Sequence, residues 1–135
     1  KLGVVGFMHC LVLEGAKKNV RVNAISPSAI TRMTEGLVPP AIGAYMRPDL
    51  VSPAVAWLCS EQCQESGVIV SAIGGYFSRI QLMETEGVQF DPTQPVSADM
   101  VAEAFASFGR LDTAKPIDPS PAGQIEVRLR GLGLL

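Results

Sequence analysis

The sequence is short of charge, of histidine and of long apolar runs, and each shortage excludes a class of protein. Charged residues make up 18% of the 135 residues and the net charge is −2, so no basic surface for nucleic acid is expected. No apolar run approaches the roughly 20 residues that a membrane span needs. Hydrophobic residues make up 47%, which excludes a disordered chain and leaves room for one modest core.

Cysteine is scarce as well. Three cysteines, an odd number, argue against a disulfide framework, so reduced thiols and a cytoplasmic location are expected. Cys59 and Cys63 lie four residues apart, but a metal site needs more ligands and His9 is the sole histidine. No metal is therefore expected. The glycine pairs near either end of the chain neither follow a strand nor open a helix, so a glycine-rich phosphate turn is missing.

The first part of the chain alternates between apolar segments and turns. The pattern predicts helix 2–18, strand 20–25, a helix from Ser52-Pro53 to Gly67, and strand 68–73. Pro27 is expected to end the first strand, and Gly74-Gly75 the second. Helix 2–18 is apolar nearly all the way round, which predicts cover on more than one side. Strand, helix and strand in this order are typical of a parallel sheet.

The second part has a different character. Residues 76–83 are expected to be extended, and Ser97 is expected to cap a third helix whose apolar stripe runs from Val101 to Leu111. Residues 113–123 carry three prolines and are expected to form a linker or tail. Residues 124–130 alternate between apolar and charged side chains, which predicts an edge strand or an arm that reaches another subunit.

Two segments of the first part resemble the short-chain dehydrogenase/reductase family. Arg21-Val-Asn-Ala-Ile-Ser-Pro27 and Ala29-Ile-Thr31 are similar to the strand and loop that hold the nicotinamide end of the cofactor, with Ser28 where a glycine is common. Lys1-Leu-Gly-Val-Val-Gly-Phe7 resembles the segment that begins with the lysine of the Tyr-x-x-x-Lys motif. Gly74-Gly75 also fits, so the resemblance covers residues 1–75.

Within that family, the chain looks most like the 3-hydroxyacyl-CoA dehydrogenase units of peroxisomal multifunctional β-oxidation enzymes and their bacterial relatives. Residues 32–34, 48–59 and 72–76 carry this likeness. Those units continue beyond the last strand with an extra segment and helix, as residues 76–111 do here.

The resemblance implies an α/β fold: the C-terminal part of a Rossmann-like doubly wound parallel sheet with an extra C-terminal helical segment. Residues 1–75 are expected to be the C-terminal half of a dinucleotide-binding domain, and residues 76–135 an extension with one helix and a proline-rich tail. Two strands and three helices leave strand edges and apolar faces without cover. We therefore expect a missing N-terminal half, with the catalytic tyrosine just before Lys1, and no turnover by this chain alone.

The resemblance also assigns roles to individual residues. Lys1 is expected to be catalytic: it would bind the nicotinamide ribose and lower the pKa of the tyrosine phenol. Thr31 would bond the carboxamide or pyrophosphate through its hydroxyl, Ile30 would bond the carboxamide through its backbone, and Pro27 would end the strand at the cofactor. Without the resemblance, Lys1 is a solvated chain end and Thr31 caps the turn that follows it.

Apolar residues of segment 32–48 are expected to form a mobile lid over an acyl or sterol-like substrate: Met33, Leu37, Val38, Ile42, Tyr45 and Met46. Ordinary packing of a surface loop explains them equally well.

The intact protein is expected to transfer hydride between a secondary alcohol or ketone and a nicotinamide cofactor, NAD or NADP, with NAD slightly favoured. A 3-hydroxyacyl thioester is the favoured substrate. The alternatives are a ketoacyl or steroid-type reductase, and a non-catalytic scaffold that lost its active site. The apolar helix 2–18 is expected to form a homo-oligomer interface, and neither nucleic acid nor membrane is expected as a partner.

Overall fold

The computed structural model describes residues 1–34, 36–37, 39–118 and 120–135. The chain forms two compact units, residues 1–81 and residues 82–135.

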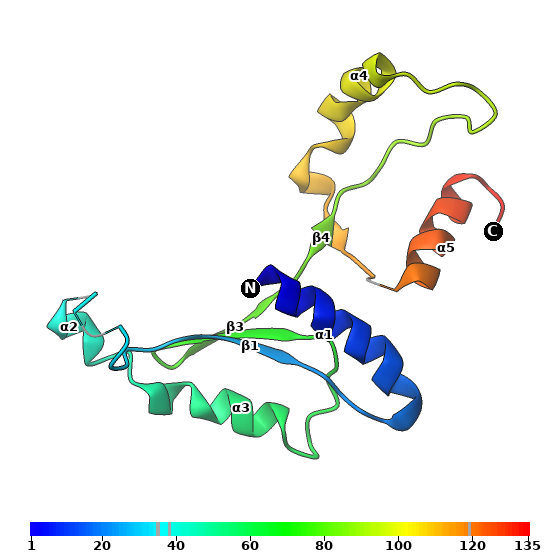
Figure 1. The fold of residues 1–135 in the computed structure, drawn as a ribbon. Helices are drawn as coiled ribbons and strands as arrows, with labels where there is room; N and C mark the ends of the chain where they lie inside the picture. Colours follow the sequence, from blue (N-terminus) through cyan, green and yellow to red (C-terminus); the bar gives the residue numbers. More distant parts are fainter. Residues whose placement is uncertain (35, 38, 119) are drawn as a thin grey trace. The chain divides into compact units, whose positions relative to one another are not determined.

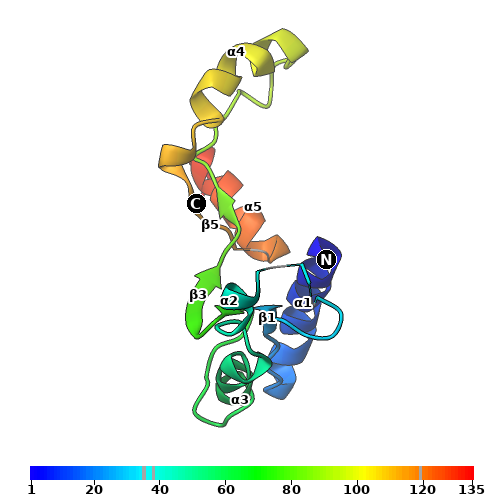
Figure 2. The ribbon, with the colours of Figure 1, turned by 90° about the vertical axis from the view of Figure 1, so that its left-hand side faces the viewer.

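Unit 1 is a small sheet between helices. Its elements are α1 (Leu2–Gly15), the 3-10 helix η1 (Ala16–Lys18), β1 (Ala24–Ser28), α2 (Pro40–Gly43), the 3-10 helix η2 (Pro48–Leu50), α3 (Ser52–Leu58), β2 (Ile69–Ile73) and β3 (Tyr76–Ile80). The strand order is β1-β2-β3, with β1 parallel and β3 antiparallel to β2. Helices α1 and α3 lie on opposite sides of β1 in both views (Figures 1 and 2).

The core of unit 1 lies where α3 packs on β2. Ala72 is fully buried there together with Val51 and Ala54, and partly buried residues of β1 and β2 surround them. On α1 the buried side chain is Met8, whereas Leu2 and Phe7 are 80% and 63% exposed. Part of the apolar surface of α1 is therefore uncovered in this chain.

Several predicted elements are confirmed. Helix 2–18 is present as α1 and η1, and Asn19 ends it in the left-handed conformation with φ 53°. Strand 68–73 is present as β2, and β1 and β2 pair in parallel as the strand–helix–strand pattern predicts. The extended segment after Gly75 forms β3, which joins the same sheet through the Gly74-Gly75 turn.

The prediction that Pro27 ends the first strand is wrong. The strand runs from Ala24 to Ser28, and Pro27 pairs with Ala72 inside it. The Ala24 N–H donates to the Val68 carbonyl at 2.9 Å, and N–H groups along a strand point alternately to its two sides. The nitrogen of Pro27 therefore points away from β2, where β1 is at the edge of this sheet and no donor is required.

The residues before β1 bind a loop instead of forming a regular ladder. The Asn23 amide donates to the Glu65 carbonyl at 2.9 Å, and its oxygen accepts from the Val68 N–H at 3.2 Å. The Gly67 N–H donates to the Val22 carbonyl at 2.8 Å. These bonds explain why the strand begins four residues later than predicted, and they give Asn23 a structural role.

The second helix is shorter than predicted and starts differently. Val51, not Ser52, occupies the N-cap position, and α3 ends at Leu58 rather than near Gly67. The Ser60 hydroxyl donates to the Trp57 carbonyl at 2.8 Å, and a turn follows at Cys63. A carbonyl of the last turn is thereby satisfied by a side chain, so the helix can stop there.

Unit 2 contains β4 (Met83–Glu84), α4 (Ala98–Phe108), the 3-10 helix η3 (Leu111–Thr113), β5 (Lys115–Pro116) and α5 (Pro121–Gly131), with β4 and β5 antiparallel. The predicted cap is confirmed: the Ser97 hydroxyl accepts from the Met100 N–H at 3.2 Å. The rings of Phe105 and Phe108 pack edge to face on the predicted stripe, with centroids 5.1 Å apart.

The predicted edge strand at residues 124–130 is wrong, because this segment belongs to helix α5. The expectation of one helix and a proline-rich tail is wrong for the same reason, since the extension carries both α4 and α5. The Ser120 hydroxyl caps the helix by accepting from the Gly123 N–H at 3.0 Å, and Pro121 occupies its first turn. Glu126 accepts from Arg130 one turn later, an ion pair typical of helical spacing. The N-cap, the proline in the first turn and the ion pair favour a helix more strongly than the alternation of apolar and charged residues favours a strand.

Replacing Asn23 with alanine is expected to lower the free energy of unfolding of the protein that carries this chain by about 1–3 kcal/mol, since a carbonyl and an N–H lose their partner. Urea denaturation measures the change. The control is Gln64→Ala, which removes an amide that bonds the nearby Glu61 carbonyl and is expected to change stability by less than about 0.5 kcal/mol. Equal effects of the two variants would contradict the account of this junction.

Candidate functional site

The carboxyl ends of β1 and β2 lie at one edge of the sheet. Their parallel register ends with Ser28 opposite Ile73, so the segments that follow both strands begin at the same place. Helix α1 leads through a turn into β1 and runs opposite to it, so its first residue, marked N, lies toward the same side (Figures 1 and 2). Ligands of open α/β sheets bind at this kind of edge.

Thr31, three residues beyond β1, lies in a turn held by two hydroxyl groups. Its backbone N–H donates to the Thr34 hydroxyl oxygen at 2.8 Å, and its own hydroxyl oxygen accepts from the Met33 N–H at 3.3 Å. The Thr34 hydroxyl lies 3.3 Å from the Ala29 carbonyl oxygen, to which it can donate. Thr31 itself is exposed, so the turn presents its hydroxyl at the surface.

The segment 39–46 is fastened to the same edge. The Ile30 N–H donates to the Met46 carbonyl at 2.7 Å, and the Ile30 side chain faces Gly43. Gly74, in the left-handed conformation with φ 55°, lies against the Tyr45 carbonyl: a Cβ at this position would be 2.9 Å from that oxygen. A side chain at position 74 would push the segment away.

The residues predicted for the cofactor lie at or toward this edge. Pro27 belongs to β1, and Ile30 and Thr31 follow it in the turn. Lys1 is exposed at the head of α1, where its carbonyl accepts from the Val4 N–H at 3.0 Å. The structure therefore joins Ile30 and Thr31 in one loop and directs Lys1 to the same side through the course of α1.

The residues predicted for the substrate are largely exposed: Met33 (92%), Leu37 (75%), Tyr45 (74%) and Ile42 (50%), with Met46 partly buried. Val38, the sixth, lies outside the described residues. The described residues of this part of the chain include the short helical turns α2 and η2, as predicted, and Arg47 donates to Asp49 in an ion pair at 2.9 Å. Hydrogen bonding from Arg47 holds the pKa of the Asp49 carboxyl below its usual value.

Sequence reasoning missed Thr34, which bonds three points of the turn around Thr31. The spacing Thr-x-x-Thr is itself a signal, because threonine hydroxyls three residues apart in a turn commonly bond neighbouring backbone groups. The link from Ile30 to Met46 was also missed, since no local pattern connects residues sixteen positions apart.

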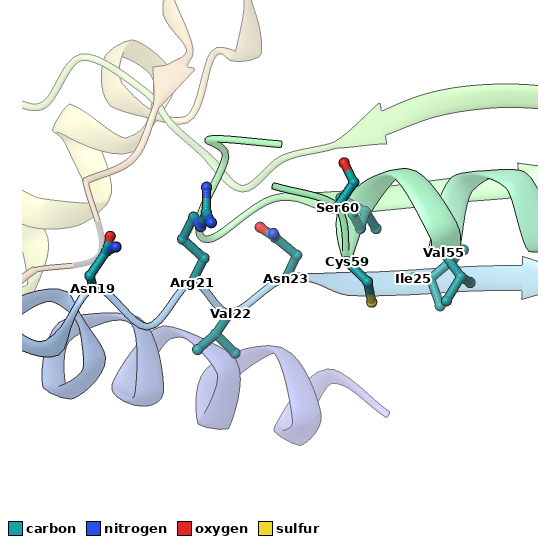
Figure 3. Close-up of a pocket in the computed structure, with 9 residues that line it drawn as sticks. Asn19, Arg21, Val22, Asn23, Ile25, Val55, Cys59 and Ser60 are labelled. Carbon is teal, nitrogen blue, oxygen red and sulfur yellow. The ribbon is translucent and has the colours of Figure 1, made fainter. Parts of the chain in front are cut away.

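A cavity of about 520 Å³ lies at the opposite, amino-terminal end of β1 (Figure 3). It is lined by residues before and within β1 and by the end of α3: Asn19, Arg21, Val22, Asn23, Ile25, Val55, Leu58, Cys59 and Ser60. Two of its polar side chains bond the protein's own backbone, Arg21 to the Cys63 carbonyl and Asn23 to the Glu65 carbonyl. The cavity includes none of the predicted site residues.

No family model matches the chain. It is 40% identical over 115 residues to a Mycobacterium tuberculosis protein named as a short-chain type dehydrogenase/reductase, and 32% identical over 131 residues to the mouse peroxisomal multifunctional enzyme type 2. These matches cover 85% and 94% of this chain. The chain belongs to the short-chain dehydrogenase/reductase family.

The structure agrees with this membership. The full-length peroxisomal multifunctional enzyme type 2 of Drosophila melanogaster superposes on 98% of the chain with a TM-score of 0.82 and 27% identity. The α/β fold with a parallel sheet, predicted from the resemblance, is therefore confirmed. The chain spans 40% of the mycobacterial relative, 18% of the mouse enzyme and 24% of the Drosophila chain, less than half of each.

Among the described residues, no helix is long and apolar enough to cross a membrane.

Gly74→Ala is expected to release segment 39–46 from the edge, because the new Cβ meets the Tyr45 carbonyl. Hydrogen–deuterium exchange measures the effect as faster exchange at residues 42–46. Gly75→Ala is the matched control: its φ is 81°, so both variants carry backbone strain of about 1 kcal/mol, but no atom lies within 4 Å of a Cβ at position 75. Equal exchange in the two variants would contradict the contact.

Proposed function

We propose that the protein carrying this chain is an oxidoreductase that interconverts a secondary alcohol and a ketone with a nicotinamide cofactor. One observation supports this most strongly: in a member of this family, the turn that carries Thr31 and the head of α1 lie toward the same edge of the parallel strands β1 and β2. That edge is where open α/β sheets bind dinucleotides.

The donors at this edge suit the nicotinamide half of such a cofactor. The Thr31 hydroxyl oxygen accepts from the Met33 N–H, so its own hydrogen can be donated to a carboxamide or phosphate oxygen. The Lys1 ammonium has three donors for ribose hydroxyls. When bound, the nicotinamide supplies or accepts the hydride. NAD is the slightly favoured form in this proposal, and NADP is the alternative.

The Ile30 backbone N–H, which the sequence assigns to the carboxamide, has a partner within the chain. Its N–H donates to the Met46 carbonyl in this structure, so either its carbonyl faces the carboxamide or segment 39–46 moves when the cofactor binds. The same bond joins segment 39–46, the proposed lid, to the loop that carries Ile30 and Thr31. Cofactor binding at this loop is therefore coupled to the position of the lid.

In the proposed reaction, the positive charge of Lys1 stabilises a deprotonated tyrosine. A cationic ammonium one helical turn beyond a tyrosine stabilises the phenolate, which then removes the hydroxyl proton of the alcohol. The family resemblance supplies the tyrosine, and this chain supplies the ammonium at the head of α1.

The proposed substrate is a 3-hydroxyacyl thioester or the corresponding ketone. The apolar residues of the proposed lid offer surface for an acyl chain, because several of them, including Met33 and Tyr45, are largely exposed. A ketoacyl or steroid-type reductase of the same family is the second candidate, and kcat/KM for acyl thioesters against steroid ketones distinguishes the two. A scaffold role requires that no nicotinamide cofactor binds.

Lys1→Ala is expected to lower kcat of the protein that carries this chain by at least about 100-fold, because the proton acceptor loses its neighbouring cation. Absorbance of the reduced nicotinamide follows turnover of a 3-hydroxyacyl thioester. Lys17→Ala, which removes an exposed lysine from η1, is the control and should retain wild-type kcat. If Lys1→Ala retains wild-type kcat while the wild-type protein turns over, Lys1 has no catalytic role.

The apolar surface of α1 is proposed to join a second copy of the protein. Leu2, Val4 and Phe7 are 80%, 56% and 63% exposed on this helix, more apolar surface than a single helix normally leaves in water.

A cytoplasmic location remains part of the proposal, in keeping with three free cysteines.

Phe7→Glu is expected to reduce the mass of the protein in solution from that of an oligomer to that of a monomer, because a carboxylate would be buried in the interface. Light scattering after size-exclusion chromatography measures this mass. Lys17→Glu changes charge at an exposed position beyond the apolar surface and should leave the oligomer intact. A wild-type protein that is monomeric would refute the interface.

A further inference from the structure

The Thr34 hydroxyl is the centre of the turn that carries Thr31. It accepts from the Thr31 N–H at 2.8 Å and lies 3.3 Å from the carbonyl oxygens of Ala29 and Thr31, to either of which it can donate. It also lies 3.5 Å from the Thr31 hydroxyl oxygen. One side-chain oxygen therefore touches the backbone before Thr31, the backbone of Thr31 and the side chain of Thr31.

These contacts fix the direction in which Thr31 can act. The Thr34 backbone N–H donates to the Thr31 carbonyl at 2.9 Å, so the side chain and the backbone of Thr34 both hold the same residue. The Thr31 hydroxyl oxygen receives the Met33 N–H within this turn, and its hydrogen can be donated to the Thr34 oxygen 3.5 Å away or to an acceptor outside the turn. Thr34 is partly buried whereas Thr31 is exposed, so Thr34 holds the turn from its side facing the protein.

We propose that Thr34 is a positioning residue: its hydroxyl orients Thr31 as a hydrogen-bond donor to an oxygen of the nicotinamide half of the cofactor. This inference rests on the proposed function, since it concerns the same edge of the sheet. Thr34 acts through Thr31, and loss of its hydroxyl weakens cofactor binding without removing any group that touches the cofactor.

The test compares three variants in the protein that carries this chain. Thr34→Val keeps the shape of the side chain and removes the hydroxyl, Thr34→Ser keeps the hydroxyl, and Thr31→Val removes the group that Thr34 orients. The Kd for NADH and for NADPH is measured from the fluorescence of the reduced nicotinamide, independently of turnover. Thr93→Val is the matched control, because the Thr93 hydroxyl bonds the local Asp91 carboxylate in the other unit.

Thr34→Val is expected to raise the Kd of the preferred cofactor by about five- to tenfold, as expected for one hydrogen bond, whereas Thr34→Ser and Thr93→Val stay within about twofold of wild type. The decisive comparison is the double variant. If Thr34 acts through Thr31, Thr31→Val/Thr34→Val binds no more than about twofold more weakly than Thr31→Val alone, because the group to be oriented is already gone.

Three results would overturn the inference. The first is wild-type Kd in Thr34→Val. The second is loss of affinity in the double variant equal to the product of the two single losses, which indicates a general structural effect of Thr34. The third is a weakened Thr34→Ser, which shows that the methyl group and not the hydroxyl matters. Absence of NADH and NADPH binding in the wild-type protein would instead refute the proposed function and this inference together.

Discussion

Parallel pairing of β1 with β2 is the constraint on which the rest of unit 1 depends. Because Ala24 pairs with Ile69 and Ser28 with Ile73, both strands point the same way and both end at one edge. Helix α1, which precedes β1, runs opposite to it, so its first residue lies toward that side (Figure 1). The segments that follow β1 and β2 therefore begin at one edge, and the amide of Asn23 secures the other end of the pair.

The edge that results combines a rigid frame with short turns, as functional loops on α/β sheets generally do. The hydroxyls of Thr31 and Thr34 organise one turn, and the bond from Ile30 to Met46 attaches segment 39–46 to it. Gly74 allows segment 39–46 to approach the end of β2 because it has no Cβ and tolerates a positive φ. The cavity of about 520 Å³ lies at the other end of β1, where Arg21 bonds the protein's own backbone, so a cavity alone does not locate the site.

The elements that depend on residues close together in the sequence were predicted correctly. The apolar helix, the strand 69–73 and the cap at Ser97 depend on neighbouring residues and were predicted from them. The extent of β1 was not predictable, because Pro27 can pair only where its nitrogen points away from β2, and that direction follows from the register with the partner strand. At residues 124–130 two local signals conflicted, and the cap at Ser120 prevailed over the alternation. Contacts that shape the site, such as Ile30 with Met46, depend on chain folding and left no pattern in the sequence.

The central claim is that the cofactor occupies the carboxyl edge of β1 and β2, and hydrogen–deuterium exchange with and without NADH tests it directly in the protein that carries this chain. The account predicts that saturating NADH slows exchange at residues 29–34 and 42–46, the two segments joined by the bond between Ile30 and Met46. Slower exchange at residues 19–23 and 58–60, around the cavity at the opposite end of β1, with the carboxyl edge unchanged, would contradict it.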